Sequence, residues 1–210
     1  MRFFAIISWP RSGLHFLESS LNTHNLVECP IEPFNSDEVT ALSAREYLDS
    51  YRATKVNVGI TFHWNHVRVP YRDIWNIVIE EEWPIISLDR KDALAQFVSL
   101  SIAEKTQQWH TFDSVSPLHQ LYVYPEEFMT WIDNRDKYRA ENLSYLLGSK
   151  KSVLHITYES LVYGSGLADA QRYIGIPVRK IKPKTKKQGH SLEDTIINYD
   201  ELVKLELIVA

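Results

Sequence analysis

Residues 3–21 read FFAIISWPRSGLHFLESSL, and this stretch decides the class of fold that we expect. The apolar run from Phe3 to Ile7 is short and nearly continuous, which is typical of a strand buried on both faces of a parallel sheet. After Gly13, leucines recur at positions 14, 17 and 21, the spacing of one helix face. The stretch therefore predicts a buried strand, a tight turn and a helix.

The same alternation of strand and helix continues along the chain. Further strands are expected at 56–62, 84–88 and 153–158, and helices at about 43–52, 70–78, 92–107, 126–147 and 167–173. Strands that alternate with helices are joined by right-handed crossovers and form a mostly parallel sheet. We therefore predict a single α/β domain over residues 1–210, with a mostly parallel central sheet flanked by helices.

Composition limits the classes of function. The 210 residues carry a net charge of −4, which argues against a general nucleic-acid coat. We expect no integral membrane segment and no signal peptide, because the apolar runs are too short. Cys29 is the one cysteine, which excludes an intrachain disulfide and is typical of a reducing compartment. The expected location is the cytoplasm.

The turn between the first strand and the first helix has the chemistry of an anion site. A helix N-terminus offers unpaired backbone N–H groups and the positive end of the helix dipole. Gly13 lets an anion approach the backbone, Ser12 offers a hydroxyl and Arg11 offers a fork of charged donors. The turn lacks the second glycine and the lysine of a Walker A loop. The structural alternative is a tight turn with a surface arginine.

A second group of anion-binding residues follows the strand expected at 84–88. Arg90 comes at the end of this strand, and Ser99 follows nine residues later within a helix. The two side chains can meet on a single phosphate, one from the strand end and the other from the helix face. A register shifted by one residue would select Lys91 instead of Arg90. The structural alternatives are a salt bridge from Arg90 to Asp92 and a solvent-facing serine.

Together these segments resemble the sulfotransferase family. Residues 10–13, PRSG, with Leu17, are similar to the family's 5′-phosphosulfate loop, although Leu14 and His15 stand where the family has two hydroxyl residues. Residues 89–99 and 103–110, DRKDALAQFVS and AEKTQQWH, resemble the 3′-phosphate site and helix of bacterial carbohydrate sulfotransferases of the trehalose and Nod-factor type. Residues 154–161, LHITYESL, resemble the family's strand followed by Tyr-Glu-x-Leu.

The resemblance implies a P-loop-like sulfotransferase fold, with 3′-phosphoadenosine 5′-phosphosulfate (PAPS) as the co-substrate. The residues that it assigns to the 5′-phosphosulfate are Arg11, Ser12, Gly13, Leu14 and His15. Those that it assigns to the 3′-phosphate are Arg90 and Ser99, and those in a segment covering the cofactor are Lys186, Lys187 and Gln188. It also implies an acceptor hydroxyl on a small molecule or glycan, most simply a carbohydrate or glycolipid, with acceptor-side elements within 35–51 and 111–149.

The acceptor proton needs a base, and two kinds of residue are candidates. Glu32 lies in a Glu-Pro segment that resembles the source of the carboxylate base in bacterial sugar sulfotransferases. His63 and His66 follow the strand expected at 56–62, as a base histidine does in many cytosolic sulfotransferases. Arg11 is a third catalytic candidate, as the cation beside the leaving phosphate. No metal is expected, because the two histidines have no cysteine nearby and no obvious third ligand.

Two other functions are alternatives. A sulfotransferase-like nucleotide-binding protein without turnover would account for Leu14 and His15 in the turn, and for the lysine missing near Thr61. An ATP-dependent small-molecule kinase would need a Walker lysine and a Mg²⁺-binding carboxylate at a strand end. The absent lysine and the presence of Arg90 and Ser99 argue against the kinase.

Overall fold

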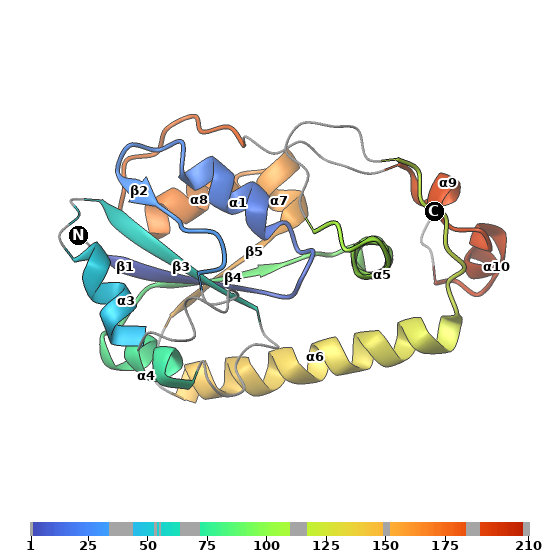
Figure 1. The fold of residues 1–210 in the computed structure, drawn as a ribbon, viewed down its shortest axis with the longest axis horizontal. Helices are drawn as coiled ribbons and strands as arrows, with labels where there is room; N and C mark the ends of the chain where they lie inside the picture. The colour runs from blue at the N-terminus through green and yellow to red at the C-terminus, as the bar shows by residue number, and fades with distance from the viewer. Residues whose placement is uncertain are drawn as a thin grey trace.

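The computed structural model of the chain describes residues 2–33, 44–52, 54, 56–63, 72–109, 117–148, 152–183 and 190–207. Strands and helices alternate from β1 to α5, and helices predominate in the rest of the described chain (Figure 1). The strands are β1 (Phe3–Ser8), β2 (Val27–Glu28), β3 (Asn57–His63), β4 (Ile85–Asp89) and β5 (Val153–Thr157). The helices are α1 (Leu14–Leu21), α3 (Ala44–Tyr51), α4 (Arg72–Glu80), α5 (Ala93–Thr106), α6 (Pro125–Gly148), α7 (Tyr158–Tyr163), α8 (Gly166–Tyr173), α9 (Leu192–Thr195) and α10 (Tyr199–Lys204).

The described strands form one parallel sheet in the order β2-β3-β1-β4-β5. β1 lies at the centre, where all six of its residues are buried, as expected for a strand covered on both faces. Ser8, the last residue of β1, is paired with His63 of β3 on one side and with Leu88 of β4 on the other. This parallel sheet flanked by helices confirms the predicted fold class.

Two layers of helices cover the two faces of the sheet (Figure 1). Successive side chains of a strand point to opposite faces, so Phe3 and Ile7 face one layer while Phe4 and Ile6 face the other. The first pair packs with side chains of α3, α4 and α6. The second pair packs with side chains of α1, α7 and α8. The core is therefore a three-layer α/β sandwich.

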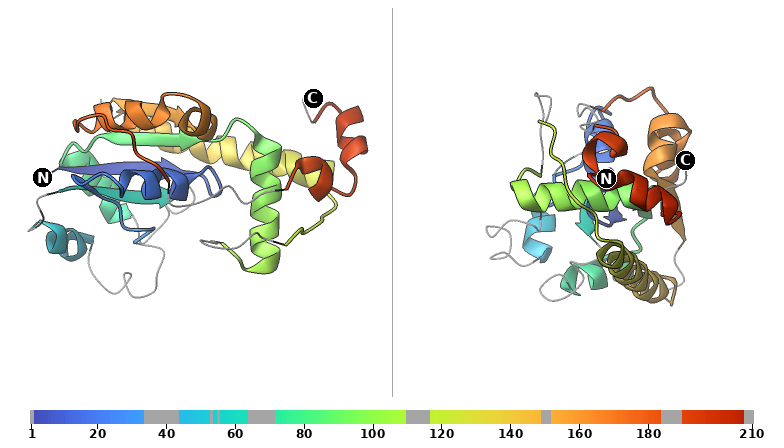
Figure 2. Two further views of the ribbon diagram at one scale, coloured as in Figure 1. Left: turned by 90° about the horizontal axis from the view of Figure 1, so that it is seen from above. Right: turned by 90° about the vertical axis from the view of Figure 1, so that its right-hand side faces the viewer.

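Helix α6 runs along one layer and continues past the sheet toward α10 (Figures 1 and 2). There a third apolar cluster joins α5 and the start of α6 to the C-terminal helices, with Val98, Phe128 and Leu202 among its buried members. The Asn198 side chain accepts from the backbone N–H of Val123 and donates to its carbonyl oxygen, both at 2.9 Å. Among the described residues, no helix is both long and apolar enough to cross a membrane.

Most of the expected elements lie within a few residues of the observed ones, and the exceptions are short. The strand expected at 153–158 ends at Thr157, because the Thr157 side chain accepts from the backbone N–H of Ser160 in a capping box that begins α7. Helices α7, α9 and α10 contain six, four and six residues and were not predicted. Elements of one or two turns are too short to show a periodic apolar pattern.

Candidate active site

The carboxyl ends of β1, β3 and β4 meet at one edge of the sheet, and several expected site residues follow or end these strands. The turn 9–13 follows β1, His63 ends β3, and Arg90 comes directly after β4. Ligands of open parallel sheets bind at this edge. They bind at the point where the order of the strands reverses, because the crossover connections there run toward opposite sides of the sheet. β1 is at such a point here, because β3 lies on one side of it and β4 on the other. The topology alone therefore predicts a ligand site at this edge.

The turn after β1 has a backbone that only a few residue types adopt without strain. Arg11 has a φ of 65° and Gly13 has a φ of 89°, both in the left-handed region. A Cβ atom on Gly13 would lie 2.4 Å from Cδ2 of Tyr158, so a side chain there would collide with this ring. Gly13 is also the N-cap of α1 and provides no side-chain cap, which leaves the N-terminal amides to other partners. Leu14 is buried in the core and can offer only its backbone.

Arg11 and Arg90 lie side by side at the edge of the sheet. The backbone carbonyl oxygen of Arg11 accepts from NH1 of Arg90 at 3.4 Å. The Arg11 side chain donates to Oγ of Ser99 at 2.9 Å and to the carbonyl oxygen of Trp109 at 2.7 Å. Burial and the neighbouring Arg90 cation lower the pKa of Arg11 from its ordinary value, whereas Glu32 raises it. The positive charges of these two partly buried arginines attract an anion, because a bound anion would offset the repulsion between them.

Arg90, and not Lys91, faces the turn. Its guanidinium lies 5.1 Å from the ring centre of Tyr158, and its Nε is buried with no hydrogen-bond partner among the described residues. Lys91 is exposed, and its backbone N–H donates to the carboxylate of Glu159. The structure thus brings Arg90, Arg11 and Ser99 together. In the described part of the chain, the Nε–H group of Arg90 has no protein acceptor.

Gln96 of α5 ties the turn to that helix. The Gln96 side chain is 1% exposed, and its Nε2 donates to the Pro10 carbonyl oxygen and to Oγ of Ser12, both at 2.8 Å. Ser12 is itself fully buried, so its hydroxyl supports the turn from within. Phosphate binding by the Ser12 side chain therefore stays a prediction. Gln96 was not predicted as a site residue, although it lies in the motif that contains Arg90 and Ser99.

Glu32 and His63, offered by the sequence as alternative bases, are hydrogen-bonded to one another. Nε2 of His63 lies 2.9 Å from Oε1 of Glu32, and Nδ1 of His63 lies 3.3 Å from Oγ of Ser8. The Glu32 backbone has a φ of 38°, and its N–H donates to Oγ1 of Thr61 on β3. The strand ends and this loop therefore build a Glu–His pair next to the arginines.

His15 lies between two carboxylates. Its Nδ1 is 3.0 Å from Oε2 of Glu18, an ion-pair distance without hydrogen-bond geometry, and its Nε2 is 3.6 Å from Oε1 of Glu32. Glu18 is 1% exposed. His15 thus joins the first turn of α1 to the Glu–His pair, and the expectation that it binds phosphate stays a prediction.

Some expected site residues lie outside the described part of the chain, namely His66, Lys186, Lys187 and Gln188. Within the described residues, no group of three or more His, Cys, Asp or Glu side chains is placed to hold a metal ion. Tyr158 and Glu159 were not predicted as site residues, although both lie in the Tyr-Glu-x-Leu motif after β5. Arg135 of α6, whose NH1 donates to Oε1 of Gln96 at 3.2 Å, lies in no motif that would have pointed to it.

The fold, a parallel sheet flanked by helices, is shared with two solved structures of sulfotransferases. Mouse sulfotransferase SULT7A1 was solved in complex with PAP (3′-phosphoadenosine 5′-phosphate). It aligns with a TM-score of 0.55 and 16% sequence identity, over 85% of this chain and 61% of that chain. The present chain therefore spans about three fifths of the mouse protein. A sulfotransferase from Alicyclobacillus acidocaldarius aligns with a TM-score of 0.55 and 12% identity, over 98% of this chain and 91% of that chain.

At these identities the two structures show a shared fold. No protein-family model matches the chain, and no curated protein sequence matches it.

Proposed function

We propose that the protein is a sulfotransferase that transfers a sulfuryl group from PAPS to an acceptor hydroxyl. The observation that carries this proposal is the convergence of Arg11, Arg90 and Ser99 beside the left-handed turn at Gly13. A ligand with two separate phosphate groups would meet the N-terminus of α1 and the arginine pair at once. The complex of mouse SULT7A1 with PAP supports a ligand of this class for the fold.

The described residues fit such a donor. The turn offers backbone N–H groups and, at Gly13, a surface without a side chain, which suits the 5′-phosphosulfate. The unpartnered Nε of Arg90 and the hydroxyl of Ser99 suit the 3′-phosphate. In this proposal the side chains of Lys186, Lys187 and Gln188 cover the bound nucleotide, as the family resemblance implies.

In the proposed reaction, the acceptor oxygen forms a bond to sulfur while the bond from sulfur to the 5′-phosphate oxygen breaks. The electron pair of the broken bond stays on the phosphate, and the acceptor proton passes to a base. Arg11 stabilises the charge that develops on the leaving phosphate. Glu32 raises the pKa of Arg11, so the cation and the candidate base interact electrostatically.

Glu32 is the proposed base, and His63 is the residue that orients it. When Nδ1 of His63 accepts from the hydroxyl of Ser8, Nε2 carries the proton and donates to Glu32. This tautomer holds the Glu32 carboxylate in one orientation for the transfer of the acceptor proton.

We further propose a carbohydrate or glycolipid acceptor, bound within 35–51 and 111–149 of a single cytoplasmic domain. The support is the resemblance of residues 89–110 to bacterial carbohydrate sulfotransferases. In addition, the backbone carbonyl oxygen of Trp109 accepts a hydrogen bond from Arg11, so this residue adjoins the proposed site. Trp109 is 40% exposed, which makes it accessible to an acceptor. Aromatic rings pack well against the apolar face of a sugar.

A nucleotide-binding protein without turnover is the second candidate. It is favoured by one observation: Leu14 is buried and His15 faces carboxylates, so the turn lacks two hydroxyl contacts that the related loops have.

Calorimetry followed by a transfer assay distinguishes the two candidates. We expect 3′-phosphoadenosine 5′-phosphate (PAP) to bind at least about tenfold more tightly than AMP or ATP, because only PAP carries the 3′-phosphate. Labelled PAPS offered with sugars, glycolipids and phenols then tests turnover. Transfer supports the enzyme, and PAP binding without transfer supports the binding protein. Equal affinities for PAP and AMP would contradict the 3′-phosphate site, and preference for ATP would favour a kinase.

A further inference from the structure

Helix α6 directs two arginines, one turn apart, at the two segments that are proposed to bind phosphate. Arg135 contacts Gln96, which holds the turn after β1, and Arg139 contacts Asp89, which ends β4 beside Arg90. Residues four apart on a helix lie on the same face, so both contacts come from one side of α6. From the sequence this helix was expected on the acceptor side, and neither arginine was predicted to have a role.

The first contact fixes the orientation of a buried amide. A glutamine side chain has donors on its nitrogen and an acceptor oxygen, and Nε2 of Gln96 serves both Pro10 and Ser12. Its Oε1 accepts a charge-assisted bond from Arg135. If the amide turned over, an oxygen would face the Pro10 carbonyl oxygen. Arg135 thus selects the orientation in which Gln96 can hold the turn.

The second contact holds the end of β4. NH2 of Arg139 lies 2.7 Å from Oδ2 of Asp89, and both side chains are partly buried. Burial raises the pKa of Asp89, and the Arg139 cation opposes this effect. Consecutive residues at a strand end point to opposite sides, so fixing Asp89 toward α6 turns Arg90 toward the turn and Tyr158.

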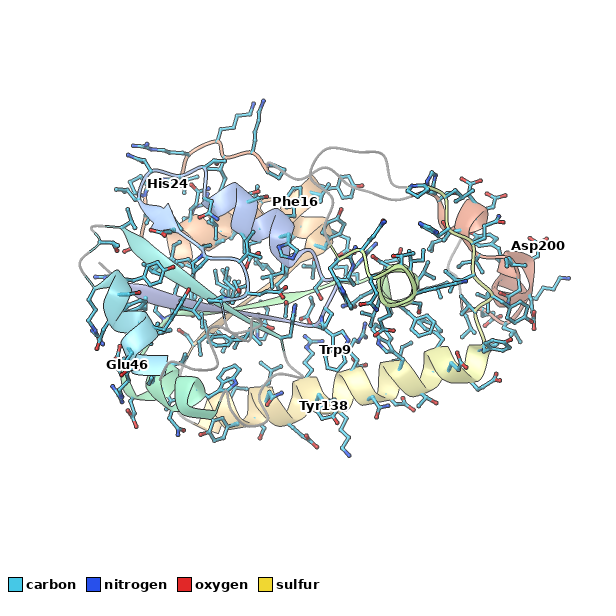
Figure 3. All side chains as sticks on the ribbon, in the orientation of Figure 1. Trp9, Phe16, His24, Glu46, Tyr138 and Asp200 are labelled. Atoms are coloured by element: carbon cyan, nitrogen blue, oxygen red, sulfur yellow. The ribbon has the colours of Figure 1, made fainter. Side chains whose placement is uncertain are left out.

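The turn also packs on α6 directly. The ring of Trp9, just before Pro10, is stacked on Tyr138 with 6.0 Å between ring centres, and it meets Trp131 edge-on at 6.4 Å. Figure 3 shows Trp9 at the end of β1 and Tyr138 on α6 below it. The arginine contacts therefore act on segments that are already packed against the same helix.

We propose that Arg135 and Arg139 are positioning residues: Arg135 sets the 5′-phosphosulfate turn through Gln96, and Arg139 sets the 3′-phosphate arginine through Asp89. The inference rests on the proposed function, because it assumes that these segments bind the two phosphates of one nucleotide. In this proposal α6 fixes the positions of the two phosphate sites relative to each other.

The test is a crossed ligand series measured by competition calorimetry against PAP. Arg135→Met should weaken adenosine 5′-monophosphate about tenfold and leave adenosine 3′-monophosphate nearly unchanged. Arg139→Met should do the reverse, and both variants should weaken PAP. Lys137→Met removes an exposed cation from α6 and is the matched control, which should leave all three affinities unchanged. A general loss of structure would weaken every ligand alike and cannot give the crossed pattern.

A second set of variants removes the dependence on any single substitution. Asp89→Asn should give the same selective loss as Arg139→Met, and the double variant should add little, because the two residues act as one unit. Arg135→Lys and Arg139→Lys keep a cation and should therefore retain part of the affinity. If a methionine variant does not fold, the corresponding lysine variant is measured in its place. If the wild-type protein binds no PAP, the proposed function fails. If it binds PAP and the variants show no ligand selectivity, the positioning roles are wrong.

Discussion

Replacing Glu32 with glutamine removes one charge and little else from the candidate active site. The amide has nearly the same shape, and its Oε1 can still accept from Nε2 of His63 across the 2.9 Å contact, so the link to Ser8 is retained. The amide cannot take the acceptor proton, however. We therefore expect kcat to fall by about 10²–10⁴-fold, the usual result of removing a general base. That range corresponds to roughly 3–5 kcal/mol of activation free energy.

His63→Ala gives the comparison that assigns the two roles. It removes the group that orients Glu32 but leaves the carboxylate, so kcat should fall by only about tenfold, the effect of one lost charge-assisted hydrogen bond. Initial rates with labelled PAPS, measured from acid to alkaline pH on the best acceptor of the screen, test both variants. Glu32→Gln should also abolish the rise of kcat with pH that ionisation of a base produces.

The control for these variants is Glu28→Gln, which neutralises an exposed carboxylate at the end of β2 and should leave kcat unchanged. PAP affinity should remain nearly constant in all three variants, because none removes a proposed phosphate contact. If His63→Ala caused the larger loss and Glu32→Gln had wild-type kcat, the base would be His63 and our assignment would be wrong.

Two further predictions concern the arginine pair and the turn. Arg11→Ala should lower kcat at saturating PAPS by about 10²-fold, and Arg11→Lys should restore part of it, whereas Arg90→Ala should mainly raise the KM for PAPS. Steady-state kinetics decides this, and an unchanged kcat in Arg11→Ala would make that residue a binding anchor only. Gly13→Ala should lower the free energy of unfolding by about 2–5 kcal/mol, because the backbone there is left-handed and the added methyl group would collide with the Tyr158 ring. Urea denaturation measures this loss, which Tyr158→Ala in the same background should reverse only in part; a fully stable Gly13→Ala protein would show that the turn tolerates a side chain.

The fold could be predicted because its central elements carry strong local signals. The uncharged run of β1 and the leucines of α1 differ in period, and Gly13 marks the turn between them. The order of the strands is a different matter, since it depends on which β-strand pairs with which. That β1 lies between β3 and β4 follows from tertiary packing, and no local pattern shows it.

The site was predictable in its parts but not in its contacts. The sequence separated Arg11 from Ser99, giving one to each phosphate, whereas the structure bonds the two side chains across 88 residues. It also could not choose between Arg90 and Lys91, because a shift of one residue at a strand end reverses the direction of a side chain. Glu32 and His63 were treated as rivals for a similar reason: nothing in a sequence shows that a loop residue meets the end of a distant strand.

The central position of β1 has a consequence for the synthesis of the protein. Both edges of this strand need partners, and β3 is complete only at His63, 55 residues after Ser8. At about 5–20 residues per second, that segment takes roughly 3–11 seconds to translate. Throughout this interval both edges of β1 are unpaired in the nascent chain. The six residues of this strand are uncharged and most of them are apolar, and such a segment favours association between chains. We therefore expect the yield of folded protein in a cell to depend on how well chaperones shield this strand, and not only on the stability of the finished sheet.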